Sequence, residues 1–221
     1  MTPEEYEKIV SERVERIKKE FATSFELLKA YPRSVTVLGS ARFAEDNIYY
    51  QKARELGEKV AKELDYAIIT GGGGGIMEAA NRGAYEAGGK SVGLNIILPR
   101  EQQNNLYETD SMMFRYFFSR KVALSFGAES YVFFPGGYGT LNEFFEIITL
   151  VQTKKIPGVP LILFGKDYWS HLDEFIRTVI FKNNGAISPS DLELYTITDD
   201  IDEIIKIIKK VSPRNVVTSS R

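Results

Sequence analysis

The sequence predicts an α/β fold, a single doubly wound Rossmann-like domain with a mostly parallel sheet and an extra N-terminal helix. Short β-branched strands alternate with helical segments along most of the 221 residues, which is typical of a parallel sheet. Two glycine-rich turns, at 71–75 and 136–139, directly follow predicted strands. A chain of this length is also sufficient for one hydrophobic core.

The first element is a long helix over residues 3–29, outside the alternating pattern. Thr2 is placed to cap it, Pro3 occupies the first helical position and Glu5 closes the first turn. We expect this helix to serve packing or assembly. The predicted boundaries are 1–32 for the helical extension, 33–211 for the core and 212–221 for a loose polar tail.

The core alternates strands and helices in a regular order. Apolar, β-branched runs predict strands at 35–38, 66–69, 91–98, 131–134, 160–164 and 194–197. Amphipathic spacing predicts helices at 47–63, 76–87, 116–126, 140–153, 168–183 and 199–210. The segment 99–114 is predicted to be a long polar loop, of the kind that often covers a binding site. Ligands of such sheets bind beyond the carboxyl ends of the strands, where both glycine turns lie.

The composition excludes several classes of function. The net charge of −2 argues against a nucleic-acid partner, which needs clustered basic residues. Because cysteine is absent, disulfides and thiolate chemistry are excluded and a cytoplasmic location is favoured. The polar N-terminus and the lack of a long apolar run predict neither a signal peptide nor a membrane span. His171 is the only histidine, so we expect no metal site.

The segment 133–146, FFPGGYGTLNEFFE, carries the strongest functional signal. Three glycines within four positions let backbone N–H groups surround an anion, and the following helix directs its positive end to the same place. The turn 71–75 contains five successive glycines, more than a tight turn beneath a helix requires. Together the two turns predict a site for a nucleotide or a sugar phosphate.

Two familiar phosphate motifs do not fit the turn 71–75. The spacing G-x-G-x-x-G fails because its last position falls on Ile76 or Met77. The next strand also lacks the acidic residue that would hold the ribose of NAD. A Walker loop requires a lysine after the glycines, and none follows here. Dinucleotide and ATP sites are therefore disfavoured.

Two charged residues fall on apolar helix faces beside the turns. At about 100° per residue, Glu143 lies between Ile147 and Leu150, where partial desolvation would perturb its pKa. The alternative is a capping box, in which Thr140 and Glu143 only close the start of their helix. Arg120 also lies on an apolar stripe, where a guanidinium needs an anion or an aromatic ring. For Arg120 the alternative is a structural ion pair.

These motifs resemble the LOG family, the cytokinin riboside 5′-monophosphate phosphoribohydrolases. The likeness runs over residues 35–169 and includes PGGYGTLNE at 135–143, Arg120-Lys121, GGGGGIMEAAN at 71–81 and Gly39-Ser40. It implies a Rossmann-like homodimer that cleaves the N-glycosidic bond of a nucleoside 5′-monophosphate. The substrate would be AMP or an N6-modified AMP, the products would be a free base and ribose 5-phosphate, and no cofactor is implied.

The resemblance also assigns roles to residues. Arg120 and Glu143 are implied as the catalytic pair. The implied substrate-binding residues are Ser40, Gly72, Gly73, Gly74, Gly75, Glu101, Lys121, Gly136, Gly137, Tyr138, Gly139 and Thr140. Within this set, the turn around Gly136–Thr140 would hold the 5′-phosphate. Many relatives are labelled lysine decarboxylases, but nothing in these residues supports pyridoxal phosphate chemistry.

Some positions depart from the family pattern. Phe118-Ser119 stands where short members carry Met-His, Asn142 replaces a common acidic neighbour, and Gly74 stands where relatives often have proline. The preference between cytokinin nucleotides and plain AMP therefore stays open. A second class of function is also open, a non-catalytic carrier of a nucleotide or of a phosphorylated pterin such as the molybdenum cofactor. The presence of both Arg120 and Glu143 favours the enzyme.

Overall fold

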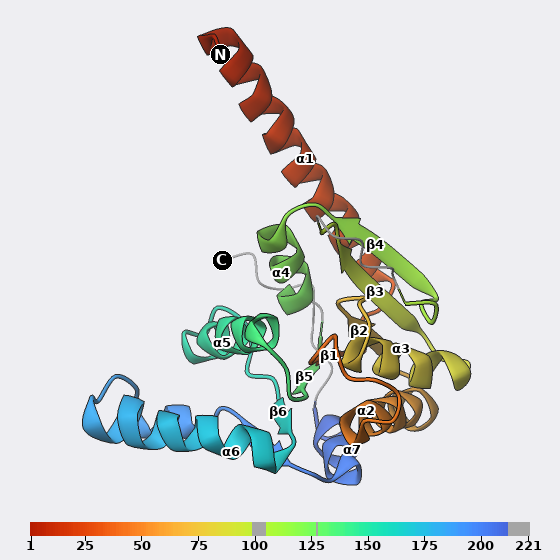
Figure 1. Cartoon of the computed structure of the whole chain (residues 1–221), viewed down its shortest axis with the longest axis vertical. Coiled ribbons are helices and arrows are strands. Elements are labelled where there is room, and N and C mark those ends of the chain that lie inside the picture. The colour runs from red at the N-terminus through yellow and green to blue at the C-terminus, as the bar shows by residue number, and fades with distance from the viewer. Residues whose placement is uncertain (99–104, 127, 212–221) are drawn as a thin grey trace.

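The protein is represented by a computed structural model that describes residues 1–98, 105–126 and 128–211. Seven strands form one sheet in the order β4-β3-β2-β1-β5-β6-β7, and every neighbouring pair is parallel. Helices cover both faces of this sheet (Figure 1). The predicted doubly wound, Rossmann-like α/β fold is confirmed.

The strands are short, and the central ones are fully buried. Their bounds are Ser34–Leu38 (β1), Ala67–Thr70 (β2), Ser91–Ile96 (β3), Asp110–Phe114 (β4), Ser130–Phe133 (β5), Leu161–Phe164 (β6) and Thr196–Thr198 (β7). Every residue of β1, β2, β3, β5 and β6 is buried. Strands covered by helices on both faces need apolar, β-branched side chains on both sides, which is the pattern in the sequence.

Seven α-helices accompany the strands in the described part of the chain. Their bounds are Pro3–Lys29 (α1), Ile48–Lys59 (α2), Ile76–Glu86 (α3), Phe117–Phe126 (α4), Tyr138–Gln152 (α5), Lys166–Phe175 (α6) and Ile201–Lys209 (α7). π-Helical segments, Val60–Leu64 and Ile176–Asn183, continue α2 and α6, and a 3-10 helix spans Pro189–Glu193. The predicted start of α1 is confirmed, because Thr2 and Glu5 form a reciprocal capping box.

The core has a separate apolar cluster on each side of the sheet and a third beneath α1. Helices α2, α3 and α7 pack on one face, where Ile204 and Ile208 are fully buried. Helices α5 and α6 pack on the other face around Trp169, whose indole N–H lies within hydrogen-bond distance of Phe133 O and Phe164 O. The third cluster joins α4 and the end of α1 to β2, β3 and β4. The carboxyl ends of the strands are left for the connecting turns.

One predicted loop contains a strand. Residues 110–114, placed in the polar loop 99–114, form the edge strand β4, which pairs in parallel with β3. Burial alternates along it, with Met113 exposed and Phe114 buried. The first two residues of this edge strand, Asp110 and Ser111, are polar, so its sequence does not read as a continuous apolar run.

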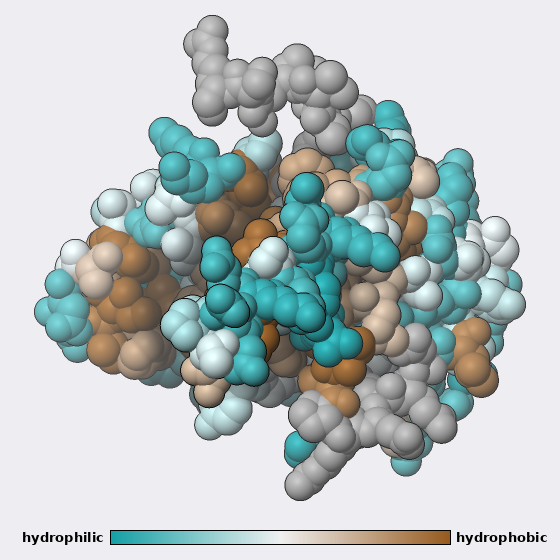
Figure 2. Space-filling view, turned by 90° about the horizontal axis from the view of Figure 1, so that it is seen from above, coloured by the Kyte–Doolittle hydropathy of each residue, from teal (hydrophilic) through white to brown (hydrophobic). Residues whose placement is uncertain are grey.

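Helix α1 differs from the rest of the molecule because its N-terminal half projects away from the sheet (Figure 1). Its C-terminal half packs on α4, with Phe25 and Phe126 at 4.5 Å between ring centroids and Leu28 buried. The view from the projecting end (Figure 2) shows hydrophilic side chains nearest the viewer and hydrophobic patches beside them. None of the helices in the described ranges is long and apolar enough to cross a membrane.

Candidate active site

The two glycine turns lie on either side of Ser40, which follows β1. This is the point between β1 and β5 where the strand order changes direction. The N–H of Ser40 donates to Pro135 O at 3.0 Å, and its carbonyl accepts a hydrogen bond from Ile76 N at 2.9 Å. Gly75 (φ 64°) packs against the Ser40 and Ala41 backbone so closely that any side chain would overlap it. The turns that precede α3 and α5 are thereby fixed relative to each other.

The turn after β5 forms the N-terminal end of α5. This helix begins at Tyr138, two residues earlier than predicted, and its N-cap, Gly137, provides no capping side chain. Within the described residues, the N–H groups of Tyr138, Gly139 and Thr140 have no hydrogen-bond acceptor. Such groups, together with the helix dipole, form a site for an anion.

Gly136 anchors this turn from beneath. Its carbonyl accepts a hydrogen bond of 2.7 Å from the Tyr168 hydroxyl. A Cβ at Gly136 would overlap the Thr140 hydroxyl and lie 2.9 Å from Ser40 N, so this position requires glycine. Gly137 and Gly139, in contrast, are exposed and have open space where a Cβ would stand. The closely packed glycine shapes the turn, while the two exposed ones leave its outer side unobstructed.

Buried hydrogen bonds fix the turn 71–75. Gly72 (φ 69°) donates its N–H to Thr70 Oγ1 at 2.9 Å. Asn105 donates its backbone N–H to Gly72 O at 3.1 Å and its side-chain amide to Gly73 O at 3.4 Å. Gly74 lies at the surface side of the turn, with room for a side chain. The sequence prediction missed Asn105, which lies 33 positions along the chain from Gly72 and joins it only through the fold.

Arg120 projects from α4 onto the turn 71–75. Its Nη2 lies 3.4 Å from Gly71 O, and it occupies the space where a side chain at residue 71 would stand. Burial lowers the pKa of the guanidinium, whereas the charge of Glu143 raises it. Arginine nevertheless stays protonated in proteins. Its Nε is buried and has no hydrogen-bond partner among the described residues.

Glu143 projects from α5 toward the same region and is half-buried. Burial raises the pKa of its carboxyl group, and the nearby charge of Arg120 opposes this shift. Its Oε2 is buried and has no hydrogen-bond partner in the described ranges. The capping-box alternative is wrong, because α5 starts at Tyr138 with Gly137 as its N-cap. The ion-pair alternative for Arg120 also fails toward Glu143, since no ion pair within 4 Å joins the two in the described part of the chain.

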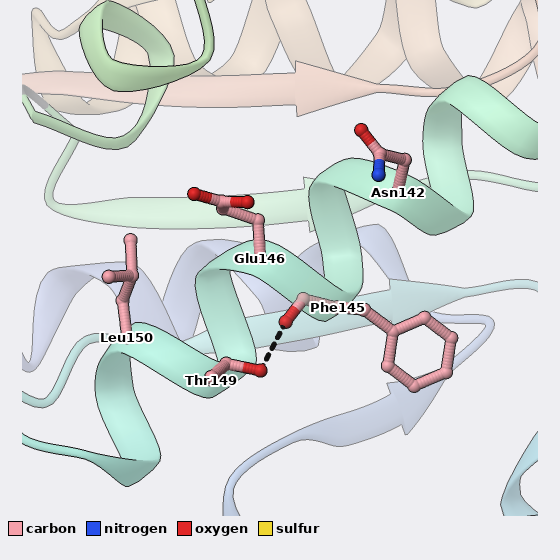
Figure 3. A pocket seen from close by; sticks show the side chains of 5 residues that line it. All are labelled: Asn142, Phe145, Glu146, Thr149 and Leu150. Atoms are coloured by element: carbon pink, nitrogen blue, oxygen red, sulfur yellow. Dashed lines mark hydrogen bonds between the residues drawn. The ribbon is translucent and has the colours of Figure 1, made fainter. Parts of the chain in front are cut away.

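Lys121 is directed to a different partner. Its Nζ lies 2.6 Å from a carboxylate oxygen of Glu146, one turn beyond Glu143 on α5. Glu146 and Asn142 line a hollow of about 320 Å3 along α5, in which Thr149 donates a hydrogen bond to Phe145 O (Figure 3). No predicted site residue lines this hollow. The predicted substrate contact of Lys121 stays a prediction.

The segment before β4 supplies an acidic residue that the sequence prediction did not identify. Glu108 accepts hydrogen bonds from Asn95 Nδ2 at 3.1 and 3.3 Å, and a side chain at Gly72 would overlap Asn95. Burial raises the pKa of Glu108. The predicted contact Glu101 lies outside the described residues. The sequence feature that could have pointed to Glu108 was the unusual length of the polar segment 99–114. Length alone does not indicate which acidic residue of the segment reaches the turn 71–75.

In residues 1–98, 105–126 and 128–211, no group of three His, Cys, Asp or Glu side chains is arranged to hold a metal ion. The described chemical groups are therefore a buried guanidinium, two half-buried carboxyl groups and free helix N–H groups. This set suits an anionic ligand whose reaction needs charge stabilisation and a carboxylate. Buried polar atoms without partners are uncommon in folded proteins, and Arg120 Nε and Glu143 Oε2 are two such atoms in the described residues.

Gly71→Ala is expected to displace the Arg120 guanidinium, because the new methyl group would overlap Nη2. The overlapping atoms, Arg120 Nη2 and Met77 Sδ, are the ends of flexible side chains, so the free energy of unfolding should change little. Because misplacing a catalytic group by about 1 Å can cost about a hundredfold, activity on the substrate proposed below should fall at least about tenfold. Steady-state rates and thermal melts of Gly71→Ala, compared with Gly158→Ala, where a Cβ meets no atom within 4 Å, test this prediction. Equal rates for both variants would contradict it.

The fold is that of a Rossmann-like α/β protein, with a candidate anion-binding site at its switch point. Among known families, the model described as possible lysine decarboxylase matches residues 77–208. The chain belongs to this family, and its LOG-type relationship is confirmed by curated relatives. It is 24% identical over 201 residues to the cytokinin riboside 5′-monophosphate phosphoribohydrolase LOG5 of Arabidopsis thaliana, covering 89% of this chain and 86% of that protein.

Solved structures show the same fold. The X-ray structure of the structural-genomics target TM1055 superposes with a TM-score of 0.61 and 25% identity, covering 81% of this chain and 99% of that one. The molybdenum cofactor carrier protein of Chlamydomonas reinhardtii gives a TM-score of 0.58 at 21% identity, covering 81% and 97%. At 21% identity, the similarity to the carrier protein concerns the fold alone.

Proposed function

We propose that this protein hydrolyses the N-glycosidic bond of a nucleoside 5′-monophosphate, releasing a free base and ribose 5-phosphate. One observation carries the proposal: the unpartnered buried atoms of Arg120 and Glu143 occur beside an uncapped helix N-terminus. The free N–H groups at the start of α5 would bind the phosphate. The charges of Arg120 and Glu143 would stabilise the ribosyl–base bond as it breaks. The names of the curated relatives support the same reaction class.

The 5′-phosphate would bind at the start of α5. The N–H groups of Tyr138, Gly139 and Thr140 would donate to its oxygens, and the helix dipole would favour its negative charge. The Thr140 hydroxyl, which is buried against Gly136, would add one more hydrogen bond. With the phosphate there, the ribose would extend toward Arg120 and Glu143.

Glu143 would act on the ribose. Cleavage of the glycosidic bond develops positive charge at the sugar, which a nearby carboxylate stabilises. The same carboxylate would accept a proton from the attacking water, since a base with a raised pKa is closer to the working pH. Its incomplete solvation strengthens both effects, because charges interact more strongly away from water.

Arg120 would act on the leaving base. Its guanidinium would stabilise the negative charge that develops on the base and would orient the plane of the ring. It is not the proton donor, because it stays protonated throughout. Glu108, beside Gly72, and Glu101, outside the described residues, are the acidic candidates to relay that proton through water.

The experiment is to incubate the protein with a panel of nucleoside 5′-monophosphates and separate the free bases by chromatography. We expect adenine or an N6-modified adenine to appear, with ribose 5-phosphate in equal amount. The matching nucleosides, which lack the phosphate, should react far more slowly. Tight binding of the nucleotides without release of a base would favour the carrier function instead.

The raised pKa of Glu143 predicts a pH-dependent effect on stability. A carboxyl group with a folded-state pKa above its ordinary value of 4.5 favours folding while protonated, and this contribution is lost as pH rises through the folded-state pKa. Glu143→Gln should therefore melt at a higher temperature than the natural protein at neutral pH, with the difference shrinking as the pH falls toward 4.5. Thermal melts across this pH range test the prediction. A lower melting temperature for the variant at neutral pH would contradict it.

A further inference from the structure

Helix α1 contributes a carboxylate to the start of α4. Glu20 of α1 accepts a hydrogen bond of 2.7 Å from the backbone N–H of Arg115 and another from the hydroxyl of Ser119. The first contact does not depend on the Arg115 side chain, because the donor belongs to the backbone. A negative charge at the start of a helix is also stabilised by the helix dipole. Glu20 therefore ties the chain before α4 to the third residue of that helix.

The residue that Glu20 holds directly precedes Arg120. Ser119 is fully buried, and its hydroxyl donates to Glu20 because a carboxylate is a stronger acceptor than a backbone carbonyl. The N–H of Arg120 donates to Tyr116 O at 3.2 Å. The Tyr116 ring lies under the guanidinium of Arg13 of α1, at 5.3 Å from the centroid. Helix α1 thus contacts both residues that fix the backbone of Arg120.

The hydrogen bonds of Glu20 define the position of α4 more tightly than the apolar contacts around them. Phe21 meets Phe118 at 6.5 Å and Phe25 meets Phe126 at 4.5 Å between ring centroids. Apolar burial is non-directional, so two helices that share it can shift by small amounts. A hydrogen bond requires a narrow range of distance and angle. The carboxylate therefore sets where the first turn of α4 lies against α1.

The position of this turn matters because Arg120 reaches the glycine turn 71–75 from it. The guanidinium Nη2 lies 3.4 Å from Gly71 O and occupies the space where a side chain at residue 71 would stand. A shift of Ser119 would be transmitted to Arg120, the next residue on the helix. A misplacement of a catalytic group by about 1 Å can cost about a hundredfold in rate.

We infer that Glu20 is a positioning residue for the candidate site. By holding Ser119 and the start of α4, it holds the Arg120 guanidinium where the leaving base would lie. Helix α1 then helps to build the site and is more than a packing element. The inference rests on the function proposed above, in which Arg120 stabilises the leaving base. Glu20 acts through Ser119 and takes no part in the chemical step.

Substitutions at both ends of the contact test this role. Glu20→Ala should lower kcat/KM for the nucleotide about tenfold, because α4 loses both hydrogen bonds. Ser119→Ala should have a similar effect, although alanine favours a helix more than serine does. Glu20→Gln should retain about half of the activity or more, since its amide can accept from the Arg115 N–H and donate to the Ser119 oxygen.

Glu26→Ala is the matched control. It removes the same charge from α1 at an exposed position, where Glu26 pairs with Lys29 at 2.7 Å. Because exposed ion pairs contribute little energy, kcat/KM of this variant should stay within about twofold of the natural value. A loss in Glu26→Ala equal to that in Glu20→Ala would show a general effect of charge on α1 and would overturn the inference.

The sharpest comparison is made in an Arg120→Ala background. If Glu20 acts through Arg120, adding Glu20→Ala should change kcat/KM by less than about twofold, because both substitutions remove the same contribution. A merely structural role would lower kcat/KM by the same factor with or without Arg120. Equal losses in the two backgrounds, or no loss in the natural background, would overturn the inference.

Hydrogen exchange measured by mass spectrometry provides a readout that does not need activity. Amide exchange in residues 116–126 should be about tenfold faster in Glu20→Ala and in Ser119→Ala, because the first turn of α4 opens more readily. Exchange in residues 138–152 of α5 should not change. Unchanged exchange in residues 116–126 would overturn the inference even if the nucleotide is hydrolysed. Faster exchange in a protein that releases no base would refute the proposed function, while the role of Glu20 in holding α4 would stand.

Discussion

Glu143→Gln is expected to lower turnover of the nucleotide at least about a hundredfold while AMP still binds. The amide keeps the shape of the side chain but removes both the negative charge and the base. A positioned acid or base usually contributes about 10²–10⁴-fold to the rate. In the proposed binding mode the 5′-phosphate lies at the start of α5, so most of the binding energy should remain. The measurement is the rate of base release, combined with calorimetric binding of AMP.

Glu174→Gln is the matched control for this substitution. Glu174 is exposed on α6 and is not part of the candidate site. Its replacement should leave the rate within about threefold of the natural protein, because substitutions of exposed residues away from a site usually have small effects. Turnover of Glu143→Gln near that of the control would remove Glu143 from the catalytic assignment.

Arg120→Ala is expected to reduce both nucleotide binding and turnover. The guanidinium lies against Gly71, and its Nε is buried and has no hydrogen-bond partner among the described residues. Removing one positioned donor to a developing anion typically costs about 10²–10³ in rate. Arg120→Lys should recover only part of this loss, because a lysine cannot reproduce the planar fork of donors.

Arg115→Ala provides the comparison for Arg120→Ala. Arg115 is exposed and lies immediately before α4, so its loss changes the net charge by the same amount. The two variants should have similar melting temperatures and very different values of kcat/KM. If the kinetics of Arg120→Ala were unchanged, Arg120 would have a purely structural role.

The sequence was sufficient to predict the elements whose pattern is local. The parallel sheet, the capping box of α1 and the inward position of Glu143 follow from strand composition, cap residues and helical spacing. The start of α5 was predicted two residues too late, because Gly137 caps the helix through its backbone and not through a side chain. Strand β4 was missed because an edge strand lacks a continuous apolar run.

Contacts between distant segments were not predictable. Asn105 holds the turn 71–75 from a position 30 or more residues later, and no local pattern indicates that it returns there. The Lys121–Glu146 pair likewise depends on how α4 lies beside α5. The family resemblance assigned Lys121 to the substrate, but a resemblance carries residue identities and not the partners that each side chain finds in this fold.

The most direct test of the central claim is a crystal structure of Glu143→Gln with AMP bound. The claim is that both glycine turns, Arg120 and residue 143 form one nucleotide site. We predict the phosphate at the N–H groups of Tyr138–Thr140 and the ribosyl–base bond between Arg120 and residue 143. AMP bound elsewhere, or with its ribose directed away from these two side chains, would contradict the claim.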